Sequence, residues 1–116
     1  MKTKRTKADD AKYCDLADKV FAWARKIDVS PSDIRIRHMT TKWASCSKTG
    51  MISLDWKVAD LPQELCDYVI VHELLHLRIP NHGKLWKSFM REYLGDWEKL
   101  EERLSLSPAC RLTLTT

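Results

Sequence analysis

The sequence predicts one domain in which α-helices are combined with a small β-structure. At 116 residues, the chain is long enough to bury one core and too short for two. Apolar residues recur with the helical period over several long segments, whereas shorter segments before the middle of the chain alternate apolar and polar residues. We therefore expect residues 1–116 to form a single α+β domain, with residues 1–7, which are rich in lysine and arginine, as a flexible basic tail.

The first half of the chain is expected to form a helix, a strand and a hairpin. Residues 8–27 have apolar positions at helical spacing, and a turn rich in serine and proline follows them. Residues 34–38 alternate apolar and polar side chains, as a half-exposed strand does. Residues 41–46 and 51–58 are both strand-like, and the short loop between them ends in glycine, so this pair predicts a β-hairpin.

The next helix is apolar on almost every side over residues 65–77, which is typical of a buried helix. Asp60 has a glutamine three positions later, and this capping-box spacing predicts the start of the helix. Pro80 should end it, because the residue before a proline is pushed away from helical dihedral angles. Residues 83–94 and 96–104 are predicted to follow as two further helices that are separated by a glycine.

The buried helix carries His72, Glu73 and His76 in the pattern H-E-x-x-H. Residues four apart on a helix lie nearly above one another, so both imidazoles can reach one ion from the same face. His82 is the candidate third ligand, since a chain that leaves the helix after His76 can turn back toward the metal. The remaining histidine, His38, falls on the polar side of its strand and is expected at the surface.

Three histidine ligands predict a catalytic Zn²⁺ site, because a structural zinc usually has four protein ligands and leaves no position for water. Zinc can lower the pKa of a bound water to about 7, and Glu73 would serve as the general base toward that water. Imidazoles also accept nickel, cobalt or iron. The competing interpretation is that the histidines are satisfied by hydrogen bonds within the core. The motif in an otherwise apolar helix favours the metal, since buried His and Glu need partners.

The location of the protein is predicted from what the sequence lacks. It has no apolar run long enough to span a membrane and no apolar segment of a signal peptide at its N-terminus, so we expect no membrane partner and a cytoplasmic protein. The four cysteines are scattered without a C-x-x-C pair and are expected to be reduced. The basic tail could contact nucleic acid through phosphates, although such a charge run is more often a solvated end.

Several stretches of the chain resemble one known family. These stretches are residues 43–56, residues 61–76, Asn81, His82 and Trp86. They are similar to the YgjP-like metal-dependent hydrolases, a group of predicted zinc metallopeptidases, and the similarity extends from about residue 34 to about residue 104. In the hairpin the family usually has Arg-Trp-Gly-Ser-Cys, and here Lys42 and Ala44 replace the arginine and the glycine.

The resemblance implies a small zincin fold, in which a short antiparallel sheet packs on the H-E-x-x-H helix and additional helices surround it. It implies His72, His76 and His82 as the Zn²⁺ ligands, Glu73 as the catalytic base, and hydrolysis of bonds in a peptide or protein substrate. By analogy with related zincins, an edge of the strand over residues 51–58 could bind an extended substrate by strand addition. A strand that is paired on both sides would not allow this.

The alternative function is a nucleic-acid-associated module, or a protein-interaction module, in which the zinc is structural. A closed site with four protein ligands would favour this alternative, whereas a position open to water would favour the hydrolase. Tyr68 lies one turn before His72 on a similar helix face, and we expect it in the core and not in the chemistry.

Overall fold

The computed structural model describes residues 7–39, 42–79, 81–106 and 113–114. In chain order the elements are α1 (Lys7–Ile27), β1 (Asp33–Arg37), β2 (Lys42–Cys46), β3 (Met51–Asp55), the 3-10 helix η1 (Trp56–Asp60), α2 (Gln63–Leu75), α3 (Lys84–Leu94), α4 (Trp97–Ser105) and β4 (Thr113–Leu114). The α+β class predicted from the sequence is confirmed. Of the expected basic tail, only Lys7 is among the described residues, and it begins α1.

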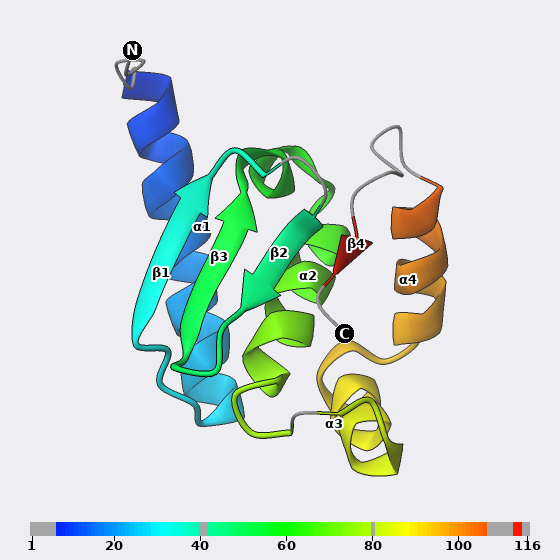
Figure 1. The fold of residues 1–116 in the computed structure, drawn as a ribbon. Coiled ribbons are helices and arrows are strands. Elements are labelled where there is room, and N and C mark those ends of the chain that lie inside the picture. The colour runs from blue at the N-terminus through cyan, green and yellow to red at the C-terminus, as the bar shows by residue number, and fades with distance from the viewer. Residues whose placement is uncertain (1–6, 40–41, 80, 107–112, 115–116) are drawn as a thin grey trace.

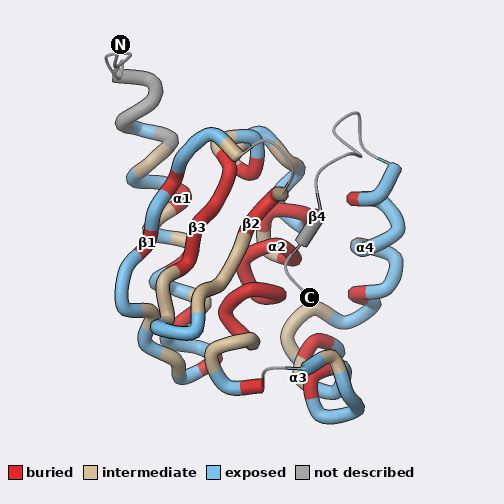
Figure 2. The backbone as a smooth tube through the Cα atoms, viewed as in Figure 1, coloured by how far each residue is buried: buried red, intermediate tan, exposed pale blue. Residues whose placement is uncertain are grey.

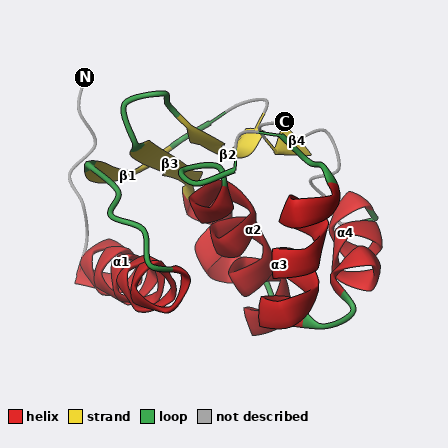
Figure 3. Cartoon of the chain, turned by 90° about the horizontal axis from the view of Figure 1, so that it is seen from below, coloured by secondary structure: helices red, strands yellow, loops and turns green. Residues whose placement is uncertain are grey.

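The sheet forms one layer and the helices form the other (Figure 1 and Figure 3). α1 and α2 lie behind the sheet, while α3 and α4 lie beyond its β2 and β4 side. α2 contacts α1, η1, β2, α3 and α4, so it is the element on which most of the others pack. A helix beneath a short sheet, with further helices around it, is the arrangement that the family resemblance implies.

The sheet is mixed, with the strand order β1-β3-β2-β4. β2 and β3 form the predicted antiparallel hairpin, in which Cys46 lies opposite Ile52 and Ala44 lies opposite Leu54. β1 is parallel to β3, and β4 pairs in parallel with the other edge of β2. The sheet is therefore antiparallel only at the hairpin, in contrast to the expected antiparallel sheet. β3 lies between β1 and β2, so β1 pairs with β3 instead of with β2, which follows it in the sequence.

β3 is a central strand that is paired on both sides, with β1 and with β2. The expectation that an edge of this strand is open to a substrate is therefore wrong. The strand also ends at Asp55 instead of continuing through residue 58. The buried carboxylate of Asp55 accepts hydrogen bonds from the backbone N–H groups of Lys57 at 2.9 Å and Met39 at 2.8 Å. The first bond caps η1, and the second holds the chain that leaves β1 against the end of β3.

α2 begins and ends at different residues from those predicted. It begins at Gln63 with Pro62 at the N-cap position and no side-chain cap. The predicted capping box is wrong, because Asp60 is the last residue of η1 and does not precede α2 directly. α2 ends at Leu75, and a tight turn with hydrogen bonds between residues three apart follows it. Pro80, the predicted stop, lies outside the described residues.

The core is built around α2, of which 10 of 13 residues are buried (Figure 2). Most of these are Leu, Ile and Val, and burying each such side chain stabilises the fold by about 1.5–3 kcal/mol. α1 packs on this helix with the apolar face that its sequence period predicts. Of the tryptophans, Trp86 and Trp97 are buried, and Trp23 and Trp56 are half-buried and pack against the core. His72 and Glu73 are the two residues of α2 that are both polar and buried.

We predict that Asp55→Ala lowers the free energy of unfolding by about 3 kcal/mol, because two backbone donors lose a buried charged acceptor. The measurement is urea denaturation followed by circular dichroism. Asp18→Ala is the matched control, since Asp18 is exposed on α1 and its removal should change stability by less than about 0.5 kcal/mol. Equal stability of the two variants would show that Asp55 does not hold the end of β3.

Candidate metal centre

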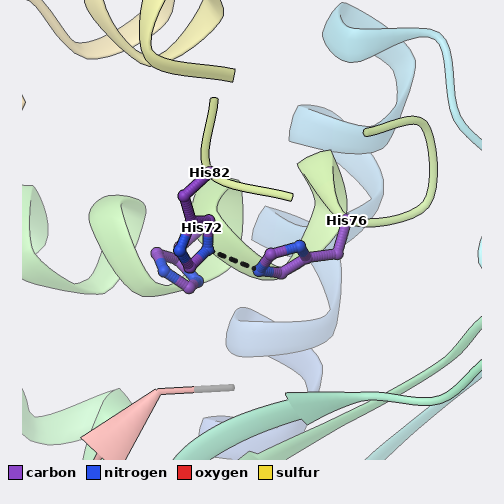
Figure 4. A group of neighbouring side chains, drawn as sticks. All are labelled: His72, His76 and His82. Atoms are coloured by element: carbon purple, nitrogen blue, oxygen red, sulfur yellow. Dashed lines mark hydrogen bonds between the residues drawn. The ribbon is translucent and has the colours of Figure 1, made fainter. Parts of the chain in front are cut away.

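His72, His76 and His82 converge at the C-terminal end of α2 (Figure 4). One ligand nitrogen from each ring lies within 4.8 Å of the other two. The Nε2 atoms of His76 and His82 are 3.0 Å apart. The ring centres are separated by 5.1 Å for His72 and His76, 5.0 Å for His72 and His82, and 4.8 Å for His76 and His82. His38 is exposed and does not belong to this group, as the sequence predicts.

The way in which the chain leaves α2 positions the second and third histidines. His76 is the C-cap residue and keeps right-handed helical dihedral angles, with φ −66° and ψ −18°, so it stays one turn away from His72 on the same face. The chain then turns back to Gly83, the N-cap of α3. The backbone N–H of Gly83 donates to Oδ1 of Asn81 at 3.1 Å, and this tight turn contains His82. The third histidine is thereby held against the first two.

The indole ring of Trp86 contacts all three histidines. Its centre lies 5.2 Å from that of His72, 6.3 Å from that of His76 and 4.3 Å from that of His82. Trp86 is buried, and Trp97 of α4 packs edge to face against it at 5.4 Å. The helices α3 and α4 therefore form a rigid aromatic wall on one side of the histidine group.

Two of the three histidines, His72 and His82, are kept in the form that binds metals. Burial lowers the pKa of His72 to about 4. Burial, and then the proximity of His72, also lowers the pKa of His82. Neutral imidazole is the metal-binding form. Nδ1 of His72 lies 2.7 Å from Oε2 of Glu73, and because a carboxylate accepts hydrogen bonds, Nδ1 carries the ring proton and Nε2 keeps its lone pair for a metal.

The donor set fits a transition metal ion in a hydrolytic site. Three imidazoles suit zinc, and they also suit nickel, cobalt or iron. Among the residues that the structure describes, no Cys, Asp or Glu side chain joins the three histidines as a fourth donor of the group. Catalytic zinc sites have three protein ligands and an open position, whereas structural sites have four protein ligands. The group therefore matches the catalytic type.

Two side chains near the centre were missed by the sequence analysis. Glu101 of α4 accepts a hydrogen bond from the hydroxyl of Tyr68 at 3.1 Å, and its charge acts to raise the pKa of His72 and His82 against the effect of burial. Cys46, at the end of β2, is close enough to Glu73 for the charge of that carboxylate to add to burial in raising its pKa. Cys46 belongs to the hairpin stretch that resembles the family, but its position near Glu73 has no signal in the sequence, and Glu101 has none at all, because both approach α2 only after the chain has folded.

Tyr68 follows the sequence prediction. It is buried on α2, one turn before His72, and the two rings are 5.8 Å apart. Its hydroxyl is directed to α4, where it donates to Glu101. We therefore assign Tyr68 to the packing between α2 and α4.

The family model of the YgjP-like metallopeptidase domain, to which the sequence was compared, matches residues 4–106 of the chain. Over 78 residues, the chain is also 36% identical to the uncharacterized protein MJ0123 of Methanocaldococcus jannaschii, a match that covers 64% of this chain and 71% of that protein. The match to the family model defines the class of the protein as a metallopeptidase. The chain belongs to the YgjP-like metallopeptidase family.

Solved structures agree with this class. The metallopeptidase zymogen of jannalysin from Methanocaldococcus jannaschii has a TM-score of 0.70 and 30% identity, and the match covers 77% of this chain and 92% of that one. The metallopeptidase zymogen of abylysin from Pyrococcus abyssi has a TM-score of 0.72, with 86% and 99% of the two chains covered; at 24% identity it supports the fold alone. The predicted peptidase activity is confirmed at the level of the family, and the nucleic-acid or interaction module is not favoured.

We predict that His82→Ala reduces bound metal from about one ion per chain to a small fraction of that value, because two imidazoles hold a metal much more weakly than three. Elemental analysis of protein purified without chelator or nickel resin measures the metal. His38→Ala is the matched control, since it removes an exposed histidine outside the group. Equal metal content in the two variants would exclude His82 as a ligand.

We further predict that Trp86→Leu weakens metal binding by about 10- to 100-fold, as the loss of groups that orient metal ligands commonly does. Titration of the metal against a chelator of known affinity gives the dissociation constant. Trp97→Leu is the control, because it removes a second buried indole for which no ring contact with a histidine is recorded among the described residues. A similar loss of affinity in both variants would mean that the effect is general destabilisation.

Proposed function

We propose that His72, His76 and His82 bind a zinc ion and that Glu73 is the general base for hydrolysis of peptide bonds. The observation that carries this proposal is the convergence of three histidine nitrogens within 4.8 Å, beside a buried glutamate, in a chain of a metallopeptidase family. Zinc is the metal that three imidazoles and one open position suit best.

Zinc bound here would supply a water with a pKa near 7 and would polarise the carbonyl of the substrate. Glu73 is fully buried, and its Oε2 accepts the hydrogen bond from Nδ1 of His72 at 2.7 Å, which fixes the carboxylate beside the histidines. Its second oxygen, Oε1, would accept the proton of the attacking water. When the scissile C–N bond breaks, the same carboxyl would pass that proton to the leaving amine.

The substrate is proposed to be a peptide or an exposed segment of a protein, as the family implies. We place the domain in the cytoplasm as part of this proposal. Cys14, Cys46 and Cys66 are free thiols, which suits a reducing compartment, and Cys110 lies outside the described residues. No helix in the part of the chain that the structure describes is both long enough and apolar enough to cross a membrane.

We predict that Glu73→Gln lowers kcat for a cleaved peptide by about 10²- to 10⁴-fold and leaves metal content unchanged, because the amide keeps the shape of the side chain but cannot accept the proton. The measurement pairs hydrolysis of a fluorogenic peptide library with elemental analysis of the same samples. His38→Ala should retain full activity. If Glu73→Gln keeps both its metal and its turnover, the general base lies elsewhere.

A further inference from the structure

A pocket of about 690 Å³ adjoins the metal centre. Three segments line it, namely residues 28–30 after α1, residues 46–50 at the turn of the hairpin, and residues 76–78 after α2. His76 belongs both to this wall and to the histidine group. Cys46 is a second link, because it lines the pocket and its thiol is near enough to Glu73 to respond to that charge. A side chain next to a bond held at the metal centre can therefore reach this pocket.

The charges of the pocket wall are unequal. Among the described residues of the wall, Lys48 and Arg78 are positive and Asp28 is the single acidic residue. Among the described residues, none of these three side chains forms an ion pair, so the described part of the wall carries two positive charges and one negative charge. A metal ion held partly by His76 would add further positive charge to the same end of the pocket.

Arg78 is held in place before any ligand binds. Its Nη1 donates to the backbone carbonyl of Ile27 at 2.8 Å, and its guanidinium lies 5.5 Å from the ring centre of Phe89. An arginine fixed by these contacts still has further N–H donors in a planar fork. The hydroxyls of Ser47 and Thr49, which are 2.9 Å apart, lie in the same wall and offer polar partners near Lys48.

We propose that this pocket binds a carboxylate of the peptide substrate through Lys48 and Arg78. The carboxylate belongs either to an Asp or Glu side chain near the scissile bond or to the C-terminus of the peptide. The inference rests on the proposed peptidase function, of which it specifies the substrate class. Among the described residues of the wall, an apolar side chain would meet Val29 and Leu77 as aliphatic partners, and a basic side chain would meet two positive charges and the single negative charge of Asp28.

The test compares peptides that differ at single positions around one cleaved bond, with Glu, Gln or Lys at each position and with a free or amidated C-terminus. For the native enzyme, kcat/KM for the preferred Glu peptide should exceed that for the Gln peptide by about tenfold, mainly through KM, since a charge-assisted hydrogen bond is stronger than a neutral one. Lys48→Glu should bring the Glu-to-Gln ratio to one or below. Lys99→Glu, an exposed reversal on α4 outside the pocket, should keep the native ratio.

The two sources of the carboxylate give different outcomes. A preference for Glu that persists in amidated peptides assigns the pocket to a side chain, whereas a preference only for free C-termini assigns it to the terminal carboxylate. Equal rates for all Glu, Gln, free and amidated peptides in the native enzyme would overturn the proposal. So would a Glu preference that Lys48→Glu leaves unchanged.

Binding measured without turnover separates this inference from the proposed function. Fluorescence anisotropy of labelled peptides with zinc-loaded Glu73→Gln protein should show about tenfold tighter binding of the Glu or free-carboxylate peptide than of its Gln or amidated match, and this difference should shrink as salt is added. The difference should be lost when Lys48→Glu is added to that protein. If the native enzyme cleaves no peptide of the series but the Glu73→Gln protein shows this pattern of binding, the proposed hydrolysis at the metal centre fails and the pocket assignment stands. Equal binding of all peptides would overturn the pocket assignment.

Discussion

The structure depends on a helix that is buried over most of its length and still carries ionisable groups in its buried part. α2 brings His72 and Glu73 into a core otherwise made of apolar side chains. Groups of this kind are costly to remove from water unless they are partnered. Here they are 2.7 Å apart, and the ring of Trp86 packs against the histidine. The elements around α2 therefore do two things at once, since they bury its apolar surface and enclose its polar residues at one end.

The metal centre also depends on where this helix stops. His76 can belong to the same face as His72 because the helical dihedral angles persist at the C-cap, and His82 can join them because the chain reverses within a few residues. Trp86 then ties the reversal to α3 through contacts with every ring of the group. A centre built in this way is packed against aromatic rings on the side of α3 and α4. It opens toward the hairpin turn, where the adjoining pocket carries the charges of a binding surface.

The patterns that predict the elements well are those that involve neighbouring residues. The period of residues 8–27 identifies α1 to within one residue, and the glycine between two strand-like runs identifies the hairpin. Predictions failed where the 3-10 helix η1 follows β3. Asp55 caps η1 and also accepts a hydrogen bond from the backbone of Met39, so β3 ends there, and Asp60 is the last residue of η1 instead of the cap of α2. The place of β1 beside β3 likewise depends on a crossover that no local pattern indicates.

The sequence by itself brought His72, Glu73 and His76 together as candidate site residues, since their spacing on a helix places them close to one another through the helical repeat alone. The return of His82 needed only a helix end and a short turn. The tertiary structure alone decided what surrounds this group. Glu101 and Cys46 come from α4 and β2, far along the chain, and they reach the centre because those elements pack on α2. Local geometry repeats along a chain and can be predicted, whereas contacts between distant segments follow from how the whole core is filled.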